Sequence, residues 1–204
     1  GGKLSARKRI SILCVASCES RREESGLFAS DNRRCENNRN RYRLYREDIG
    51  GRGFGLRSHA VHVNGFTQDG FLWCGRRSLT KPTDPGMLDN IAAGGLPVGE
   101  SLQLCSVREM AEEAGLAEAL ALTAVANGQV TTCRSVSRGW HHETLWVYNL
   151  VVPADVQPVN QDGEVAEFNL LSPQQVVQAI ASKSMTIDAS CVIAHAVLHP
   201  NVHS

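Results

Sequence analysis

Apolar and polar positions alternate first in residues 60–66 (AVHVNGF) and again in residues 70–76 (GFLWCGR). The residues between them, Thr67-Gln68-Asp69, form turns readily, so we predict a β-hairpin. Further strand-like runs follow at 121–126, 143–152 and 164–171.

Helix signals occur in three segments, which are residues 101–114, 174–182 and 188–199. Ser172 and Pro173 precede the second of them as an N-cap and a first-turn proline. Because strands and helices interleave, we predict a mixed sheet covered by helices and assign the chain to the α/β class.

The first helix carries three carboxylates. Ser101 suits its N-cap, and Gly115 suits its end because glycine adopts the left-handed conformation easily. At about 100° per residue, Glu109, Glu112 and Glu113 form one stripe. A separate arc is the expected packing face, made of Leu104, Val107, Met110, Ala111 and Ala114. We therefore expect the carboxylates to point away from the core.

Such a stripe is electrostatically unfavourable, since like charges three and four residues apart on a helix repel one another. No basic residue follows in the helix to pair with them. A divalent cation with oxygen ligands would relieve the repulsion, and Mg²⁺ is commonly held by one or two carboxylates and substrate phosphates. The alternative is an acidic helix face in contact with solvent.

The residues before the alternating pattern differ in composition. Residues 19–53 are rich in Arg, Asn, Glu and Ser and poor in aliphatic side chains, so they can bury little surface. Residues 1–58 contain 14 basic and 7 acidic side chains, and the remainder contains 7 basic and 14 acidic ones. We predict a basic, mobile leader over 1–53 and one domain over 54–204. Acids interleave with the arginines, which argues against a nucleic-acid partner.

The seven cysteines form no CxxC pair, which suits neither a disulfide framework nor a zinc site. We interpret them as reduced thiols in the cytoplasm. An organelle is the alternative location, if the basic leader is a transit peptide. No apolar run reaches the length of about 18 residues that a spanning helix needs, so we expect no membrane partner.

Around the first helix the chain also satisfies a longer spaced pattern. It reads Gly, five residues, Glu, seven residues, Arg-Glu, an apolar residue, any residue, Glu-Glu, any residue, Gly and an apolar residue. The residues that satisfy it are Gly94, Glu100, Arg108, Glu109, Met110, Glu112, Glu113, Gly115 and Leu116. This pattern is the Nudix box, so the chain resembles the Nudix hydrolases.

The resemblance implies an α/β/α sandwich with a mixed sheet and hydrolysis of a diphosphate linked to another group. It implies Mg²⁺ or Mn²⁺ as the cofactor. The implied metal ligands are the carboxylates of Glu109, Glu112 and Glu113 and a backbone carbonyl near Gly94. Arg108 and Glu100 would brace the loop by an ion pair. The candidate catalytic residues are Arg108, Glu109, Glu112 and Glu164.

Residues 54–200 also resemble a narrower Nudix group, the one fused to thiamine pyrophosphokinase in fungi. This likeness implies thiamine diphosphate, or an oxidised form of it, as the substrate. Members of that group usually have a further N-terminal domain, whereas this leader is shorter. Contacts from that domain to the substrate are therefore in doubt.

Cationic and flat side chains supply the candidate substrate contacts. Arg76, Arg77 and Lys81 lie in a turn-rich segment before the box, where they could meet a terminal phosphate. Trp140 and two adjacent histidines could stack on a heterocycle. Glu164 is a candidate further metal ligand or general base. The alternatives are a solvated basic loop, ordinary strand-edge residues and a surface glutamate.

Three other functions stay open. One is hydrolysis of a nucleoside diphosphate derivative, and another is an isopentenyl diphosphate isomerase, for which Cys74 and Cys133 lack the expected neighbours. The third is a nucleotide-binding module without catalysis, which would not need all three glutamates. We expect a small-molecule diphosphate as the partner and leave a homodimer open.

Overall fold

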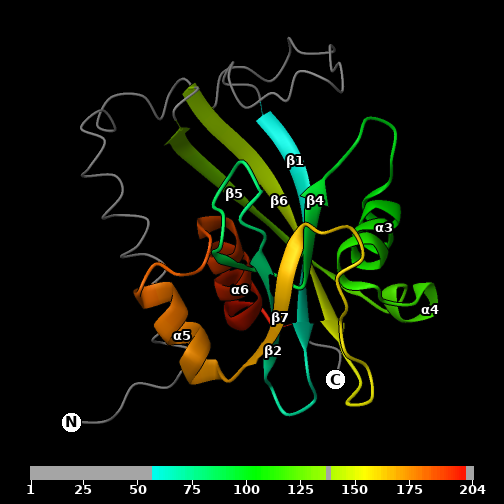
Figure 1. Ribbon diagram of the computed structural model, residues 1–204. Helices are drawn as coiled ribbons and strands as arrows, with labels where there is room; N and C mark the ends of the chain where they lie inside the picture. Colours follow the sequence, from blue (N-terminus) through cyan, green and yellow to red (C-terminus); the bar gives the residue numbers. More distant parts are fainter. Residues whose placement is uncertain (1–56, 137–138, 201–204) are drawn as a thin grey trace.

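The computed structural model describes residues 57–136 and 139–200, so the predicted leader lies outside the described residues. Figure 1 shows the elements in chain order. The strands are β1 (Arg57–Phe66), β2 (Leu72–Arg77), β3 (Leu88–Asp89), β4 (Ala92–Gly95), β5 (Val125–Val136), β6 (Gly139–Val151) and β7 (Val165–Leu171). The helices are α3 (Leu102–Ala114), α4 (Glu118–Ala121), α5 (Pro173–Ala181) and α6 (Ile187–Leu198).

One seven-stranded sheet organises the described chain. Its main path is β3-β2-β1-β6-β5, with β4 paired to β1 and β7 paired to β2. The β1–β6 pair is parallel, and the other pairs are antiparallel. The sheet is therefore mixed, as the sequence predicted.

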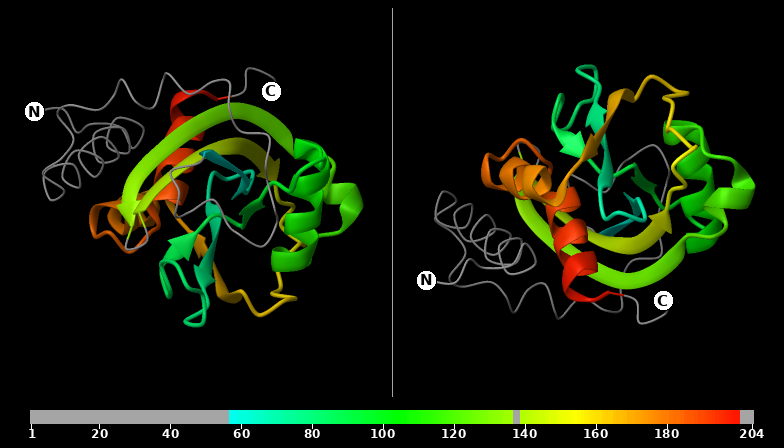
Figure 2. Two further views of the ribbon diagram at one scale, coloured as in Figure 1. Left: turned by 90° about the horizontal axis from the view of Figure 1, so that it is seen from above. Right: turned by 90° about the horizontal axis from the view of Figure 1, so that it is seen from below.

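Helices cover both faces of the sheet (Figures 1 and 2). On one face, α3 and α4 pack on an apolar cluster that includes Val61, Met110 and Leu150. On the other face, α5 and α6 pack on clusters that include Leu72 and Leu145. The arrangement confirms the predicted α/β/α sandwich. Within the described residues, no helix is long and apolar enough to cross a bilayer.

Local sequence signals predicted the positions of most helices and strands correctly. The predicted hairpin forms between β1 and β2, with Gly65 opposite Trp73. Ser101 caps α3 by accepting a hydrogen bond from the Leu104 N–H, and Gly115 ends the helix with φ of 62°. Ser172 caps α5 with a full capping box, and Pro173 occupies its first turn.

The predicted strand at 121–126 is wrong over most of its length. Its first residue ends the short helix α4, and β5 begins only at Val125 and continues to Val136. Alanine and leucine favour helix in the segment before Val125. Pairing with β6 then fixes the polar continuation of β5 as a strand, which the local pattern alone did not reveal.

Candidate functional site

The glutamates of α3 do not form the solvent-facing stripe that the helical pattern predicted. Glu109 is 8% exposed and Glu113 is 7% exposed, whereas the Glu112 side chain is 52% exposed. Leu104, expected in the core, is 58% exposed. The helix is thus rotated so that two carboxylates face the sheet. This correction matters because buried carboxylates need partners.

Strand β4 provides the space and a donor for these carboxylates. The Glu109 carboxyl group lies directly over Gly94, where any Cβ would overlap it. The backbone N–H of Ala93 donates to Glu113 Oε2 over 2.8 Å. A strand with a larger residue at position 94 would push the Glu109 carboxylate away. The residue predicted near the metal, Gly94, therefore supports the site by having no side chain.

Arg108 holds three carboxylates at once. Its guanidinium donates to both carboxyl oxygens of Glu100, with Nε–Oε1 and Nη2–Oε2 distances of 3.0 Å. Its Nη1 lies 2.8 Å from Glu109 Oε1 and 2.9 Å from Glu112 Oε2. The ion pair expected between Arg108 and Glu100 is confirmed. It ties the loop before α3 to the helix.

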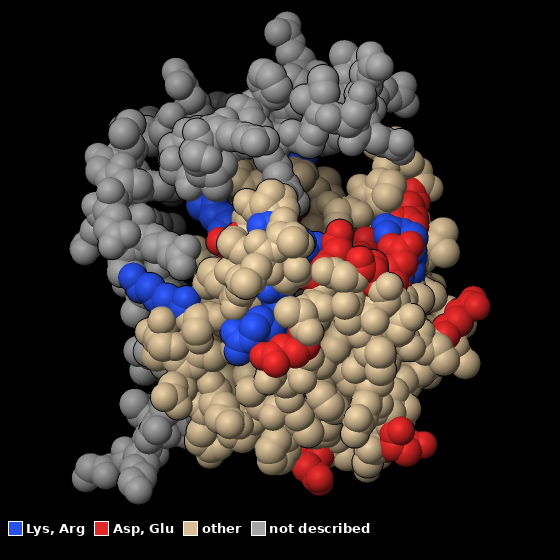
Figure 3. Space-filling model, in the orientation of Figure 1, with Lys and Arg blue, Asp and Glu red and all other residues tan. Residues whose placement is uncertain are grey.

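Lys81 and the segment before β7 close the site from the other side. The Lys81 ammonium group contacts Glu164 and lies 3.9 Å from Glu113 Oε1. Oxygen atoms of Glu113, Asp162 and Glu164 all lie within 4.8 Å of one another. The sequence analysis missed Asp162, although it lies beside Glu164 in an Asp-Gly-Glu turn. Figure 3 shows acidic and basic side chains gathered on this face near α3 and β4.

A shallow pocket opens beside these groups. Its lining includes Arg77, Lys81, Asp89, Glu113 and Glu164. The Arg77 side chain pairs with Asp89 at 2.8 Å and donates to the Thr83 carbonyl, so it fixes the loop that carries Lys81.

The two other candidate substrate contacts are Arg76 and Trp140. Arg76 pairs with Glu167 at 2.7 Å, and the pocket lining does not include it. Trp140 belongs to β6, but its side chain lies outside the described residues. Among the cations predicted to meet a phosphate, Lys81 is therefore the one that reaches the carboxylate cluster.

The electrostatics of the cluster suit a bound cation. Burial raises the pKa of Glu113 to about 8, and burial also raises the pKa of Glu109. Hydrogen bonds from Arg108 lower the pKa of Glu100. Two buried carboxylates and the nearby Glu164 offer hard oxygen donors, which are the ligands that Mg²⁺ and Mn²⁺ prefer. The donor set therefore fits the predicted cofactor.

Comparison with protein families gives one matching domain. The family model of the NUDIX domain matches residues 56–194. Nudix hydrolase 24, chloroplastic, from Arabidopsis thaliana is 42% identical over 143 residues, covering 69% of this chain and 39% of the relative. Uncharacterized protein YJR142W of Saccharomyces cerevisiae is 31% identical over 156 residues, covering 68% of this chain and 46% of the relative. The chain thus spans less than half the length of these curated relatives.

Solved structures share the fold at low sequence identity. The MutT protein from Methanosarcina mazei Go1 aligns with a TM-score of 0.57 and 17% identity, over 72% of this chain and 96% of that one. The NUDIX domain of Shewanella oneidensis NrtR, described as complexed with ADP ribose, aligns with a TM-score of 0.55 and 19% identity, over 70% of this chain and 88% of that one. These likenesses establish the sandwich fold.

Proposed function

The chain belongs to the NUDIX domain family, and we propose that it is a hydrolase that cleaves a diphosphate linked to an organic group with a divalent metal ion. The observation that carries this proposal is the burial of Glu109 and Glu113 beside β4, with Glu113 close to Asp162 and Glu164. Burying carboxylates is costly, and Arg108 and Lys81 offset this cost only in part, because burial still raises the pKa of both groups. Binding Mg²⁺ or Mn²⁺ explains why the sequence keeps them there.

Each side chain then has a chemical role. Glu109, Glu112 and Glu113 would hold the metal ion, and the ion would supply positive charge to phosphate oxygens and to the attacking water. Arg108 keeps the carboxylates in place through its contacts with Glu109 and Glu112. Glu164, at the rim, accepts the proton of the attacking water.

Lys81 has a different role, because its ammonium group lies between Glu164 and Glu113. In the described state its ammonium group contacts Glu164. A substrate phosphate offers a stronger acceptor, so Lys81 would turn to bind the terminal phosphate. That movement would free the Glu164 carboxylate for proton transfer.

The test is turnover of a panel of diphosphates with and without Mg²⁺, followed as orthophosphate and monophosphate release. We expect no turnover in EDTA. Glu112→Gln and Glu113→Gln should each lower kcat by at least about a hundredfold, since metal electrostatics supply several kcal/mol. Glu167→Gln, an exposed glutamate paired with Arg76, is the matched control and should leave kcat unchanged. Near-normal turnover in both α3 variants would contradict the proposal.

For the substrate we propose an oxidised thiamine diphosphate, cleaved to its monophosphate and orthophosphate. The support is the sequence resemblance over residues 54–200. Nucleoside diphosphate derivatives are the second candidate, since the NrtR domain that shares the fold is described with ADP ribose. We expect kcat/KM for oxidised thiamine diphosphate to exceed that for ADP-ribose, NADH and 8-oxo-dGTP by at least about tenfold. A better nucleotide substrate would refute this choice and leave the hydrolase proposal standing.

The isomerase alternative has weak support. Cys74 is fully buried in the apolar cluster under α5 and α6, and burial raises the pKa of its thiol to about 12. A thiol in that state cannot exchange protons with a substrate at the surface near α3. Incubation with isopentenyl diphosphate and Mg²⁺ should therefore yield no dimethylallyl diphosphate by mass-resolved chromatography.

We also propose that the protein is located in an organelle. Two plant relatives are named chloroplastic, which favours the organelle over the cytoplasm that the cysteines suggested. Fluorescence microscopy of the full-length protein fused at its C-terminus would decide between the two compartments. A diffuse cytoplasmic signal would exclude the organelle.

A further inference from the structure

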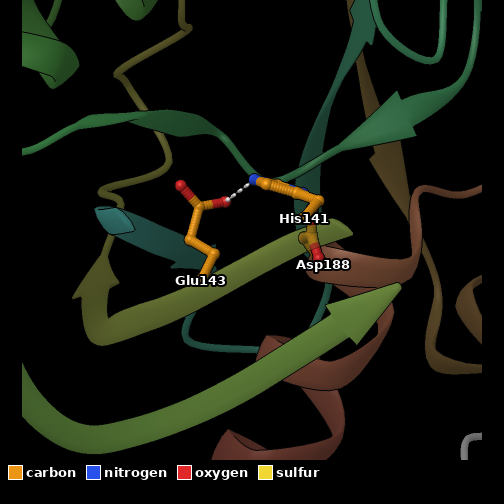
Figure 4. Close-up of side chains that lie close together, drawn as sticks. All are labelled: His141, Glu143 and Asp188. Carbon is orange, nitrogen blue, oxygen red and sulfur yellow. Dashed lines mark ion pairs between the residues drawn. The ribbon is translucent and has the colours of Figure 1, made fainter. Parts of the chain in front are cut away.

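A second cluster of polar side chains lies on the opposite face of the sheet from α3. His141 and Glu143 belong to β6, and Asp188 belongs to the first turn of α6. Alternate residues of β6, Leu145 and Val147, pack with α6, so His141 and Glu143 share that face. Figure 4 shows the ion pair between His141 and Glu143, with Asp188 drawn behind His141. This cluster is thus separate from the carboxylates of α3.

The three side chains offer a compact set of ligand atoms. One atom from each of His141, Glu143 and Asp188 lies within 4.8 Å of the others. All three residues are buried, with 5%, 6% and 9% of their surface exposed. A divalent ion about 2 Å from each ligand atom would draw the three groups closer together than this limit.

Two buried atoms in the cluster lack hydrogen bonds. Among the described residues, His141 Nε2 and Asp188 Oδ1 have no hydrogen-bond partner. His141 Nε2 lies 3.2 Å from Glu143 Oε2, but the pair is not aligned as a hydrogen bond. Native proteins rarely leave such groups unsatisfied. His141 Nε2 faces the Glu143 carboxylate, and one Asp188 oxygen belongs to the same close group of ligand atoms.

The net charge of the groups around the cluster also favours a bound cation. Arg134 Nη1 lies 3.2 Å from Asp84, and its Nη2 lies 3.3 Å from Asp188 Oδ2. The guanidinium thus pairs with Asp84 and Asp188, and the Glu143 carboxylate interacts with it electrostatically. These three carboxylates and one guanidinium leave an excess of two negative charges, which a divalent cation would balance. Ser58 donates to Glu143 Oε1 over 3.0 Å and keeps Oε2 turned to His141.

We propose that His141, Glu143 and Asp188 form a second cation site that takes a divalent transition ion such as Zn²⁺ or Co²⁺. An imidazole nitrogen with two carboxylates is typical of such ions, whereas Mg²⁺ prefers oxygen ligands alone. The bound ion joins β6 to the beginning of α6 and so stabilises the layer that α6 forms. The site does not depend on the proposed hydrolysis.

The first experiment is Co²⁺ binding to the full-length protein in excess Mg²⁺, followed by visible absorption. We expect one equivalent of Co²⁺ with the bands of nitrogen and oxygen ligation. His141→Gln and Asp188→Asn should each abolish these bands. His142→Gln is the matched control, because its side chain lies on the other face of β6, and Glu112→Gln tests the α3 site. Both controls should keep the bands.

A second set of measurements uses the wild-type protein, so its result does not depend on whether the variants fold. Zn²⁺ added in excess Mg²⁺ should raise the Tm of the wild-type protein, because a ligand of the native state stabilises it. X-ray absorption of the wild-type Zn²⁺ complex should show an imidazole nitrogen among the ligands. Three results would each overturn the site: no uptake by the wild type, full uptake by the His141→Gln protein, or a ligand shell of oxygen alone. Failure of diphosphate turnover would not bear on it.

Discussion

Replacing Glu113 by Gln should make the metal-free protein more stable while abolishing its function. The carboxyl group of Glu113 is buried, and its burial raises the pKa to about 8. Folding at neutral pH therefore requires either that the group take up a proton or that it lose its hydration. Gln has nearly the same shape, and its amide oxygen can still accept the hydrogen bond from the Ala93 N–H. The substitution removes the charge and keeps the packing.

The size of the effect follows from the pKa shift, from an ordinary value of 4.5 to about 8. At about 1.4 kcal/mol per pKa unit, the upper limit is about 5 kcal/mol. Local relaxation reduces such costs, so we expect a gain of about 2 kcal/mol, or roughly 5 °C in Tm. The sign follows from linkage: a carboxyl group with a raised folded pKa destabilises the fold above its unfolded pKa. The cost is small near pH 4.5 and grows until pH passes about 8.

The assay is thermal unfolding in EDTA from pH 4.5 to 9. Glu113→Gln should exceed the wild type in Tm at pH 8, and the difference should disappear near pH 4.5. Glu112→Gln is the control, because that side chain is 52% exposed and its carboxylate meets water in both states. Added Mg²⁺ should raise the Tm of the wild type and not that of Glu113→Gln. An equal or lower Tm for Glu113→Gln at pH 8 would refute the reasoning.

Three further substitutions test the surroundings of the site by steady-state kinetics with Mg²⁺. Gly94→Ala places a methyl group where a carboxylate of α3 lies, so kcat should fall by at least about a hundredfold; Gly95→Ala, whose Cβ meets no described atom within 4 Å, should keep its activity. Arg108→Lys retains the charge but loses the paired contacts, and kcat should fall about tenfold; unchanged kcat would show that charge alone suffices. Lys81→Gln should raise KM about tenfold with a smaller change in kcat, because it removes a phosphate contact; an unchanged KM would remove Lys81 from the substrate site.

Local sequence signals predicted the parts of the structure that depend on neighbouring residues. The Ser101 cap and the Gly115 stop of α3 act within one turn of the chain, so both were readable. The hairpin between β1 and β2 was readable for the same reason. The face that α3 buries was not, because periodicity alone assigns charged residues to solvent. Gly94 leaves space for the buried carboxyl group of Glu109, and the Ala93 N–H donates a hydrogen bond to that of Glu113.

Contacts between distant segments were beyond prediction from a single sequence. Lys81 and Glu164 meet across 83 residues, and each lies in a loop without periodic character. The cluster of His141, Glu143 and Asp188 likewise joins a strand to a helix that follows much later. Such pairings depend on the order of strands in the sheet, which alternation and caps do not encode.

The parallel pairing of β1 with β6 determines when the central part of the sheet can close during synthesis. Partners along these strands are separated by 85 residues, as for Asn64 and Asn149. Closing so long a loop is entropically costly and slows folding. A nascent chain that has completed α3 but not β6 holds its glutamates on a helix while one edge of β1 is still unpaired. Such an exposed edge invites pairing with other chains, so the interval before β6 emerges is when this protein most needs protection from aggregation.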